Sequence, residues 1–335
     1  MATIREIAEE AGVSVGTVSN VLNNPQSVAE STRLRVLEVM ERNNYRPSWV
    51  ARGLAKGRTR MLGLIVSNIS NPFTSEIVRG ASEEARSLGC SLLVMTSSSD
   101  GREAPEHVLA LRHQWVHGIF LASQPLPEDT YRQLDFGDTP VLVMDHGQTI
   151  PRQAVGLVGF DWRTAGYQAT RHLLDLGHTR IAYIGGIPGR SSTTQREEGW
   201  RLAMAEAGIS EMDEWFVSGD YQTECGYQST LSQMKRPDPP TAIVFANDMM
   251  ALGAYQAAAE LSLRIPDDFS IVGMDDNFFV AYLAPPLTTV HVPTRELGRL
   301  GVQMLVDPDD KQRQVRSLVL PTALVVRHST APPPH

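Results

Sequence analysis

The chain has 335 residues, of which 42% are hydrophobic, as expected for a globular protein of two or three domains. Its net charge of −8 is unevenly distributed, because residues 1–60 hold nine Lys and Arg against six Glu, a net +3, which leaves −11 for the remainder. A basic head on an acidic body is typical of a DNA-binding module joined to a separate domain. No run of about 18 apolar residues occurs, which excludes a membrane-spanning helix.

The start of the chain and the cysteines indicate the compartment. Arg5 and Glu6 stand where a secretion signal would be apolar, so we expect no signal peptide. Cys90 and Cys225 each lie in or beside an apolar segment, which favours buried thiols over a disulfide. No Cys/His spacing suggests zinc. We therefore expect a cytoplasmic, nucleoid-associated protein with no cofactor and no metal.

The first stretch of the chain predicts two short helices joined by a tight turn. Thr3 and Glu6 have the spacing of a capping box, Gly12 ends the first helix, and Ser14 can cap the second. The inward-facing residues at helical spacing are Ile4, Ile7, Ala8 and Ala11, then Val18, Val21 and Leu22. Such a connection is that of a helix-turn-helix, although an ordinary helical hairpin would share the spacing.

In a helix-turn-helix the second helix enters the major groove of DNA with its N-terminal residues facing the bases. The outward residues of the predicted second helix are small and none is acidic. The candidate DNA contacts in this module are Thr3, Ser14, Val15, Gly16, Thr17, Ser19, Asn20 and Asn23. Together with the basic charge, they favour the DNA-binding interpretation.

A third helix is predicted over 31–44, with four residues packing on the first two helices: Leu34, Val36, Leu37 and Met40. A basic linker follows. Pro47 suits the first turn of a helix there, while Gly53 and Gly57 would make that helix weak in isolation. Trp49 and Leu54 are apolar residues in this otherwise solvated linker, which a plain tether would not need.

From Met61 onward, short apolar runs alternate with helical segments. The predicted strands are 61–66, 91–95, 118–121, 141–144, 156–159, 181–184, 242–245 and 270–273. The predicted helices are 74–88, 103–115, 163–176, 195–207, 224–234 and 249–261. This βαβ repetition predicts doubly wound parallel sheets, and about 230 residues of it would form two sheets rather than one. Ligands of such sheets bind beyond the carboxyl ends of the strands.

Polar and aromatic residues follow the predicted strands in an orderly way. The candidate effector-binding residues are Asn71, Phe73, Thr74, His146, Asp161, Trp162, Arg190, Ser192, Arg196, Tyr221, Asn247, Asp248 and Asp275. We expect Arg196 and Asp275 to grip a small polar ligand from opposite sides, with Phe73 and Trp162 as apolar faces for its ring. Helix capping competes for any one residue, since Asp161, Asp248 and Asp275 stand where N-caps occur, but the set favours a site.

Catalytic and metal motifs are weak. The Gly185–Gly189 stretch lacks both the Walker lysine and the dinucleotide spacing, so it is interpreted as a strand-to-helix turn. Asp248, Asp275 and Asp276 have no His or Glu partner at a metal-binding spacing. No Gly-x-Ser-x-Gly nucleophile elbow is present. We therefore expect a protein that is not an enzyme.

These motifs resemble the lactose/galactose-repressor (LacI/GalR) family over nearly the whole chain. The stretches that carry the resemblance are 3–8, 11–14, 17–23, 45–47, 52–55, 247–251, 273–275 and 286–290. The family implies a homodimer on a palindromic DNA operator, with paired hinge helices that insert Leu54 into the minor groove and place Ala55 and Lys56 near the DNA. An apolar wedge of this kind partly unstacks a base step and kinks the duplex.

The resemblance also implies an effector cleft between two α/β subdomains like those of periplasmic binding proteins. The implied domains are a helix-turn-helix domain (1–46), a hinge (47–60), an N-terminal subdomain (61–160 plus 292–320) and a C-terminal subdomain (161–291 plus 321–330). Three crossovers would lie near 160–162, 291–293 and 320–322. Two departures stand out: Val15 and Gly16 replace larger base-reading side chains, and His146 replaces an aromatic residue that flanks the base in a purine-binding member.

The sequence therefore predicts a transcriptional regulator, with a repressor favoured, whose operator affinity is set by a small polar effector. A sugar or sugar derivative is favoured over a nucleobase or nucleoside. The alternatives are a sugar-binding transport protein and a sugar- or nucleoside-processing enzyme on the same fold; the basic head opposes the first, and the lack of a nucleophile or metal cluster opposes the second. The tail after Arg327 has no leucine heptad, which favours a dimer over a tetramer.

Overall fold

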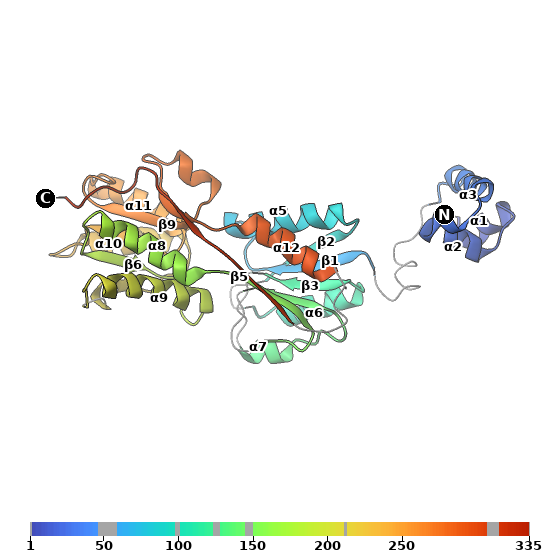
Figure 1. Cartoon of the computed structure of the whole chain (residues 1–335), viewed down its shortest axis with the longest axis horizontal. Coiled ribbons are helices and arrows are strands. Elements are labelled where there is room, and N and C mark those ends of the chain that lie inside the picture. Colours follow the sequence, from blue (N-terminus) through green and yellow to red (C-terminus); the bar gives the residue numbers. More distant parts are fainter. Residues whose placement is uncertain are drawn as a thin grey trace. The chain divides into compact units, whose positions relative to one another are not determined.

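The computed structural model describes residues 2–45, 59–97, 101–122, 128–144, 150–210, 213–306 and 315–334. The chain divides into two compact units, Met1–Arg60 and Met61–His335, which are described separately (Figure 1). The hinge positions Leu54, Ala55 and Lys56 and the candidate effector residue His146 lie outside the described residues.

The first unit is a small helical domain made of α1 (Ile4–Glu10), α2 (Val15–Asn23), the 3-10 turn η1 (Pro25–Ser27) and α3 (Glu30–Arg42). Thr3 and Glu6 form the predicted capping box, Gly12 turns the chain with φ +61°, and Ser14 caps α2 by accepting a hydrogen bond from the backbone N–H of Thr17. The core of this unit consists of Ile7, Ala8, Ala11, Val18, Val21, Val36, Val39 and Met40.

The prediction for α3 was partly wrong. Leu34 is 57% exposed and Leu37 is 44% exposed, so neither packs on the first two helices. The buried stripe of α3 is Val36, Val39 and Met40, at i, i+3 and i+4. Only one stripe of a helix can face its partners, and the two leucines fall on the other side.

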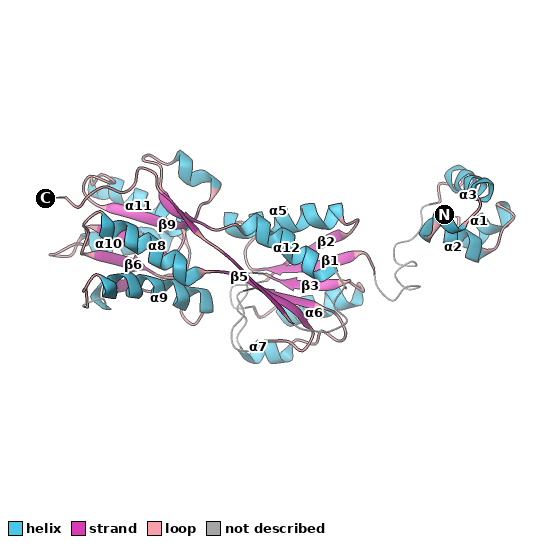
Figure 2. Cartoon of the chain, viewed as in Figure 1, coloured by secondary structure: helices cyan, strands magenta, loops and turns pink. Residues whose placement is uncertain are grey.

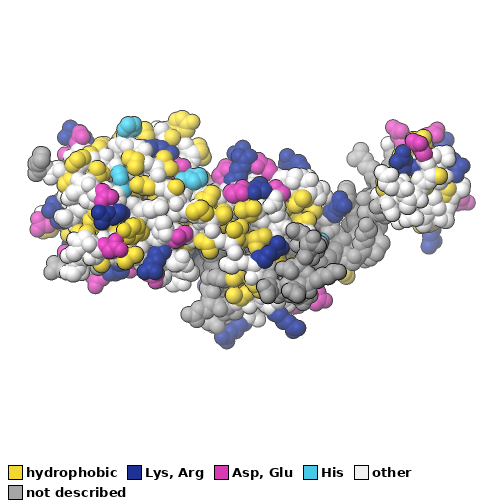
Figure 3. Space-filling view, viewed as in Figure 1, with side chains coloured by type: hydrophobic (Ala, Val, Ile, Leu, Met, Phe, Trp, Pro, Cys, Tyr) yellow, Lys and Arg dark blue, Asp and Glu magenta, His cyan; other side chains and the backbone are white. Residues whose placement is uncertain are grey.

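The second unit contains two six-stranded sheets. The first sheet has the order β11-β5-β4-β3-β1-β2, with all neighbours parallel. Its strands are β1 (Met61–Val66), β2 (Ser91–Thr96), β3 (Gly118–Leu121), β4 (Val141–Met144), β5 (Ala154–Phe160) and β11 (Arg316–Leu320). The helices that accompany it are α5 (Pro72–Ser87), α6 (Ala104–His113), α7 (Glu128–Gln133) and α12 (Thr294–Val306). Figure 3 shows opposite charges interleaved over α5 and α12, where Arg79, Glu83 and Arg295 pair.

The second sheet has the order β12-β10-β9-β8-β6-β7 and is parallel except for the edge strand β12, which runs antiparallel to β10. Its strands are β6 (Ile181–Ile184), β7 (Phe216–Val217), β8 (Ala242–Phe245), β9 (Ser270–Asp275), β10 (Thr288–His291) and β12 (Ala323–Val325). The accompanying helices are α8 (Trp162–Asp175), α9 (Ser191–Glu206), α10 (Thr223–Met234) and α11 (Asp248–Leu261), with 3-10 turns η2 (Asp213–Trp215) and η3 (Phe278–Tyr282). Helices flank both sheets (Figure 2).

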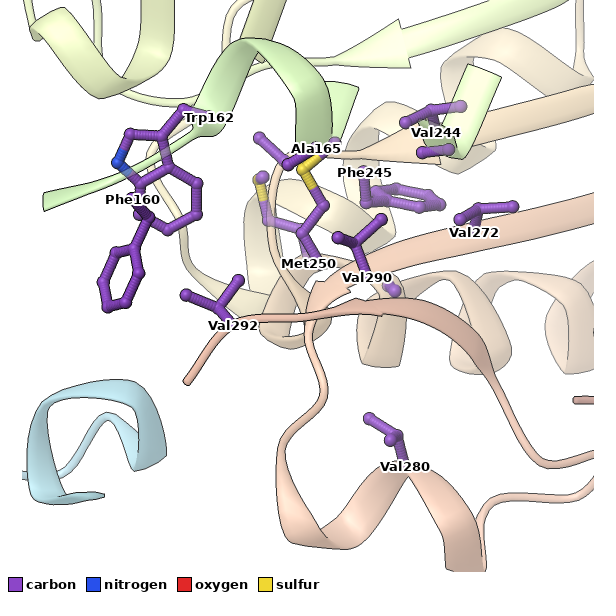
Figure 4. Close-up of a cluster of buried hydrophobic side chains, with 14 of the residues drawn as sticks. Phe160, Trp162, Ala165, Val244, Phe245, Met250, Val272, Val280, Val290 and Val292 are labelled. Carbon is purple, nitrogen blue, oxygen red and sulfur yellow. The ribbon is translucent and has the colours of Figure 1, made fainter. Parts of the chain in front are cut away.

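Among the described elements, the chain passes between the sheets from β5 to α8, from β10 to α12 and from β11 to β12. The hydrophobic core continues through this junction: the rings of Phe160 and Trp162 lie 5.1 Å apart with Val292 nearby (Figure 4). The fold class predicted from the sequence, a helix-turn-helix domain followed by two parallel-sheet α/β subdomains, is confirmed.

Three pairs of helices pack through reciprocal glycines: α5 with α12, α8 with α9, and α10 with α11. In the α8–α9 pair, a Cβ on Gly166 would lie 2.1 Å from the backbone oxygen of Arg196, and a Cβ on Gly199 would lie 2.1 Å from that of Arg163. Real Cβ atoms do not approach so closely. Glycine is therefore required at both contacts, and it fixes the position of α9 on α8.

Candidate functional site

The DNA-facing candidates lie mainly on α2 of the helical domain. Val15 is 41% exposed, and Gly16 and Asn20 are also exposed, while Thr17 and Ser19 are half-buried. None of the residues of α2 is acidic. This helix thus presents a small, uncharged surface next to its N-terminus, whose backbone N–H groups carry partial positive charge.

Two of the DNA candidates have structural roles as well. Thr3 and Ser14 are exposed, yet the side chain of each accepts a helix N-terminal N–H, from Glu6 and Thr17 respectively. The side chain of Asn23 lies outside the described residues. The structure therefore brings together on one helix the candidates from Val15 to Asn20, with Ser14 as the cap at the N-terminus of that helix.

In the second unit, Arg196 gathers residues from several elements into one cluster; we name it the Arg196 cluster (Phe73, Trp162, Thr193, Arg196 and Tyr221). Arg196 is only 4% exposed, and its guanidinium carbon lies 3.3 Å from the centre of the Trp162 ring. Its Nη1 donates to the backbone oxygen of Ser192 and to the hydroxyl of Tyr221, each at 3.2 Å. Its Nε is buried without a partner in the protein. A charged N–H donor that is buried without an acceptor costs free energy, so the Arg196 Nε indicates that an acceptor is missing.

The stacking changes the expected role of Trp162. Trp162 is 1% exposed, with Arg196 on its ring and Phe73 6.1 Å from it between ring centres. The guanidinium therefore covers a face of the ring that was predicted to receive a ligand. Phe73 is half-buried and keeps part of its ring accessible. Trp162 instead holds Arg196 in place by a cation–π contact.

Tyr221 is held by contacts that the sequence did not indicate. Its backbone has φ +67°, its hydroxyl lies 2.7 Å from Thr193 Oγ1, and its carbonyl accepts from Asn247 Nδ2 at 3.1 Å. A Cβ on Gly186 would lie 2.0 Å from the Tyr221 ring, so only glycine leaves room for it. Thr193 and Gly186 were thus missed, and only the proximity of Thr193 to Arg196 in the chain could have suggested the former.

Two buried carboxylates lie at the ends of β8 and β9. Asp275 is 6% exposed, and among the described residues its carboxylate accepts a long hydrogen bond of 3.5 Å from Asn277 Nδ2. Burial raises the pKa of Asp275 to about 7, against the opposing field of Arg196. Asp248 is fully buried and accepts from Thr289 Oγ1 at 2.6 Å and from the backbone N–H of Asn277 at 2.8 Å. Its pKa is also raised, by burial first and by the charge of Asp275 second.

The capping expectations divide among these residues. Asp161 caps α8 by accepting from the N–H of Thr164 at 3.0 Å. The expectation that Asp248 and Asp275 stand at cap positions was wrong: Asn247 caps α11, with Asp248 as the first helical residue, and Asp275 ends β9. Asp248 lies one residue past the cap of α11, and Asp275 lies two residues before Asn277, the N-cap position of η3.

The remaining candidates have mixed environments. Asn71 caps α5, Thr74 is buried, and Arg190 and Ser192 are half-buried at the start of α9. Cys90 and Cys225 are both half-buried. In the part of the chain that is described, no group of three or more His, Cys, Asp or Glu is arranged to hold a metal ion. No described helix combines the length and apolarity that crossing a bilayer requires.

Comparison with known proteins agrees with both units. Residues 3–48 match the family model "Bacterial regulatory proteins, lacI family", and residues 170–330 match "Periplasmic binding protein-like domain". The HTH-type transcriptional repressor PurR of Photobacterium profundum is 33% identical over 331 residues, covering 98% of each chain.

Two solved structures extend the likeness. The Lac repressor dimer bound to operator and the anti-inducer ONPF matches with a TM-score of 0.87 and 31% identity, over 98% of this chain and 99% of that one. A complex of the transcriptional regulator CelR with cellobiose matches with a TM-score of 0.73 and 30% identity, over 98% and 100%. The chain belongs to the lacI family of bacterial regulatory proteins and is a DNA-binding transcriptional repressor.

Proposed function

We propose that operator binding by this repressor is controlled by a small polar effector, a sugar or sugar derivative, held between Arg196 and Asp275. The observation that carries the proposal is the unfilled hydrogen-bonding capacity of these two buried groups. Arg196 Nε has no partner, and the Asp275 carboxylate receives one long hydrogen bond. A ligand hydroxyl or ring oxygen can accept from the guanidinium, and ligand hydroxyls can donate to the carboxylate.

The electrostatics of the site support a ligand rich in hydroxyl groups. Burial raises the pKa of Asp275 to about 7, which shows how poorly the ionised carboxylate is solvated in the free protein. Donation by hydroxyls stabilises the ionised form and replaces the water that Asp275 lost on burial. Phe73, half-buried and close to Trp162, offers an apolar face for the ring of the ligand.

The chemistry is shared by sugars and nucleobases, and the CelR–cellobiose complex favours the former. A sugar presents several hydroxyl donors to Asp275 and oxygen acceptors to Arg196. The sugar class therefore remains our proposal, with nucleosides and purines as competing ligands in the test.

On the DNA side, we propose that two copies of the chain bind a palindromic operator with α2 of each in the major groove. Asn20 can read adenine by its amide, and Val15 can contact a thymine methyl, while Gly16 offers only backbone. The Lac repressor match is a dimer on operator DNA. Phe278 and Tyr282, which are 76% and 84% exposed on η3, are large aromatic side chains that a second copy could cover.

The experiment is a thermal-shift screen of the full-length protein against sugars, nucleosides and purines, followed by operator binding with each hit. A ligand that binds only the folded state raises the melting temperature. Arg196→Ala and Asp275→Asn should lose the shift, whereas the control Asp268→Asn, which breaks the surface pair with Arg264, should keep it. Each of these two substitutions should lower the affinity for the ligand by about 10- to 150-fold. If both variants bind the hit as tightly as the parent does, this site is wrong; if only purines bind, the sugar class is wrong.

A further inference from the structure

The loop that presents Asp275 has an unfavourable backbone. Asp275 has φ +116° and Asp276 has φ +59°, and neither is glycine. Two consecutive non-glycine residues in this region persist only where the surroundings hold them. The contacts that hold this loop therefore decide where the Asp275 carboxylate points.

Two basic side chains, those of Arg327 and His291, hold Asp276 from the outer side of the loop. Arg327 Nη2 donates to Asp276 Oδ1 at 2.6 Å, and His291 Nδ1 lies 3.1 Å from Asp276 Oδ2. Burial alone would raise the pKa of Asp276, but the hydrogen bonds from His291 and Arg327 outweigh it and hold the pKa below its ordinary value. Both carboxylate oxygens are thus engaged inside the protein, so Asp276 has little left to offer a ligand.

Arg327 reaches Asp276 from a rigid base. Its Nη1 donates to the Leu287 carbonyl at 2.9 Å, and its backbone N–H donates to Thr288 Oγ1 at 2.9 Å. Two residues on, Ser329 is fully buried, and its hydroxyl donates to the Ile271 carbonyl at 2.7 Å. The segment after β12 is therefore fastened to β9 and β10, and the guanidinium is presented in a fixed position.

The inner side of the loop is held as firmly. Asp248 accepts from the N–H of Asn277, and the N–H of Val292 donates to the Asp275 carbonyl at 3.3 Å. Val292 follows β10 in the connection toward α12, where the chain passes to the other sheet. Asp275 is consequently bonded through its own backbone to one of the connections between the two sheets.

We infer that Asp276 and Arg327 are positioning residues for effector recognition: their ion pair clamps the loop and so fixes the direction of the Asp275 carboxylate. The inference rests on the proposed effector site. Asp276 itself does not contact the effector. Loss of the clamp lets Asp275 relax from its strained backbone conformation, and the ligand must then restore that conformation when it binds.

A double-mutant cycle with cellobiose as the probe separates positioning from general stability. Asp276→Asn should weaken cellobiose binding by about tenfold, because a charge-assisted hydrogen bond is lost. In an Asp275→Asn background the same change should cost nothing further, since the group that it positions has gone. Arg327→Lys should retain part of the affinity. The control Asp268→Asn removes an ion pair of the same subdomain and should leave the affinity unchanged. Additive losses in the cycle would overturn the inference.

A second readout needs no ligand. Hydrogen exchange of the free protein should accelerate in the 275–292 segment of Asp276→Asn, at the amides of Asn277 and Val292, and not in the Asp268→Asn control. His291→Gln is a milder variant for use if Asp276→Asn fails to fold. If the parent binds no cellobiose, the proposed sugar class loses its support. The hydrogen-exchange result then still tests whether the Asp276–Arg327 ion pair holds the loop. Unchanged exchange in that segment would contradict the inference.

Discussion

Replacing Gly166 by alanine should impair effector binding from a position that touches no ligand. The added methyl would lie 2.1 Å from the Arg196 carbonyl, whereas ordinary contact begins at 3.4 Å. Helices α8 and α9 would therefore have to separate by about 1 Å, which costs about 1–3 kcal/mol as overpacking, against about 1 kcal/mol of helix propensity gained. Because α9 carries Arg196, the separation lifts the guanidinium from Trp162.

Gly298→Ala is the matched control. Its methyl would lie 2.2 Å from the Ile77 carbonyl in the α5–α12 pair, beside the other sheet. We expect both variants to lose up to about 2 kcal/mol of folding free energy, or up to roughly 8 °C in melting temperature for a domain of this size.

The assays are thermal denaturation without effector and calorimetry with the effector identified by the screen. Only Gly166→Ala should weaken effector binding, since only that helix pair carries Arg196. Equal losses of affinity in the two variants, or an unchanged affinity in Gly166→Ala, would refute the reasoning that helix packing positions Arg196.

Three further predictions concern salt, pH and the recognition helix. Operator affinity should fall steeply as salt rises, because Lys and Arg release counterions from the phosphates, and a flat dependence measured by anisotropy would count against this mode of binding. Burial raises the pKa of Asp275 in the folded state to about 7, above its ordinary 3.8. The contribution of Asp275 to folding stability is therefore full below pH 3.8 and is lost as the pH rises toward 7. Asp275→Asn should flatten this decline in melting temperature. Ser14→Ala removes the cap of α2 and should cost the helical domain about 1 kcal/mol, seen as faster hydrogen exchange in α2, which an unchanged exchange rate would exclude.

The regular part of the fold could be predicted because its signals are local. The capping box at Thr3 and the turn at Gly12 depend on residues within one helical turn, and the buried strands are continuous apolar runs. Most of the elements that were not predicted lack such signals. Strand β7 has only two residues, and β11 has exposed residues along it, so neither forms an apolar run. Helix α12 is the exception, since it carries an apolar stripe that includes Leu297 and Val302.

The details of the candidate site could not be predicted because they depend on contacts distant in sequence. Arg196 and Trp162 are separated by more than thirty residues, and nothing local shows that the guanidinium would cover the ring. The burial of Asp248 follows from Thr289 and Asn277, which reach it from other elements. Residue types at strand ends indicated which side chains gather, but packing decides which of them remain available to a ligand.

The most direct test of the account is to measure effector affinity with and without saturating operator DNA, and operator affinity with and without saturating effector. If the repressor is controlled by a ligand bound at Arg196 and Asp275, each partner must change the affinity of the other by the same factor, typically about 5- to 150-fold. In Arg196→Ala and Asp275→Asn, operator affinity without effector should stay at the parent value, while the effector's influence disappears. An effector that binds the parent with equal affinity in the presence and absence of operator would contradict the central claim.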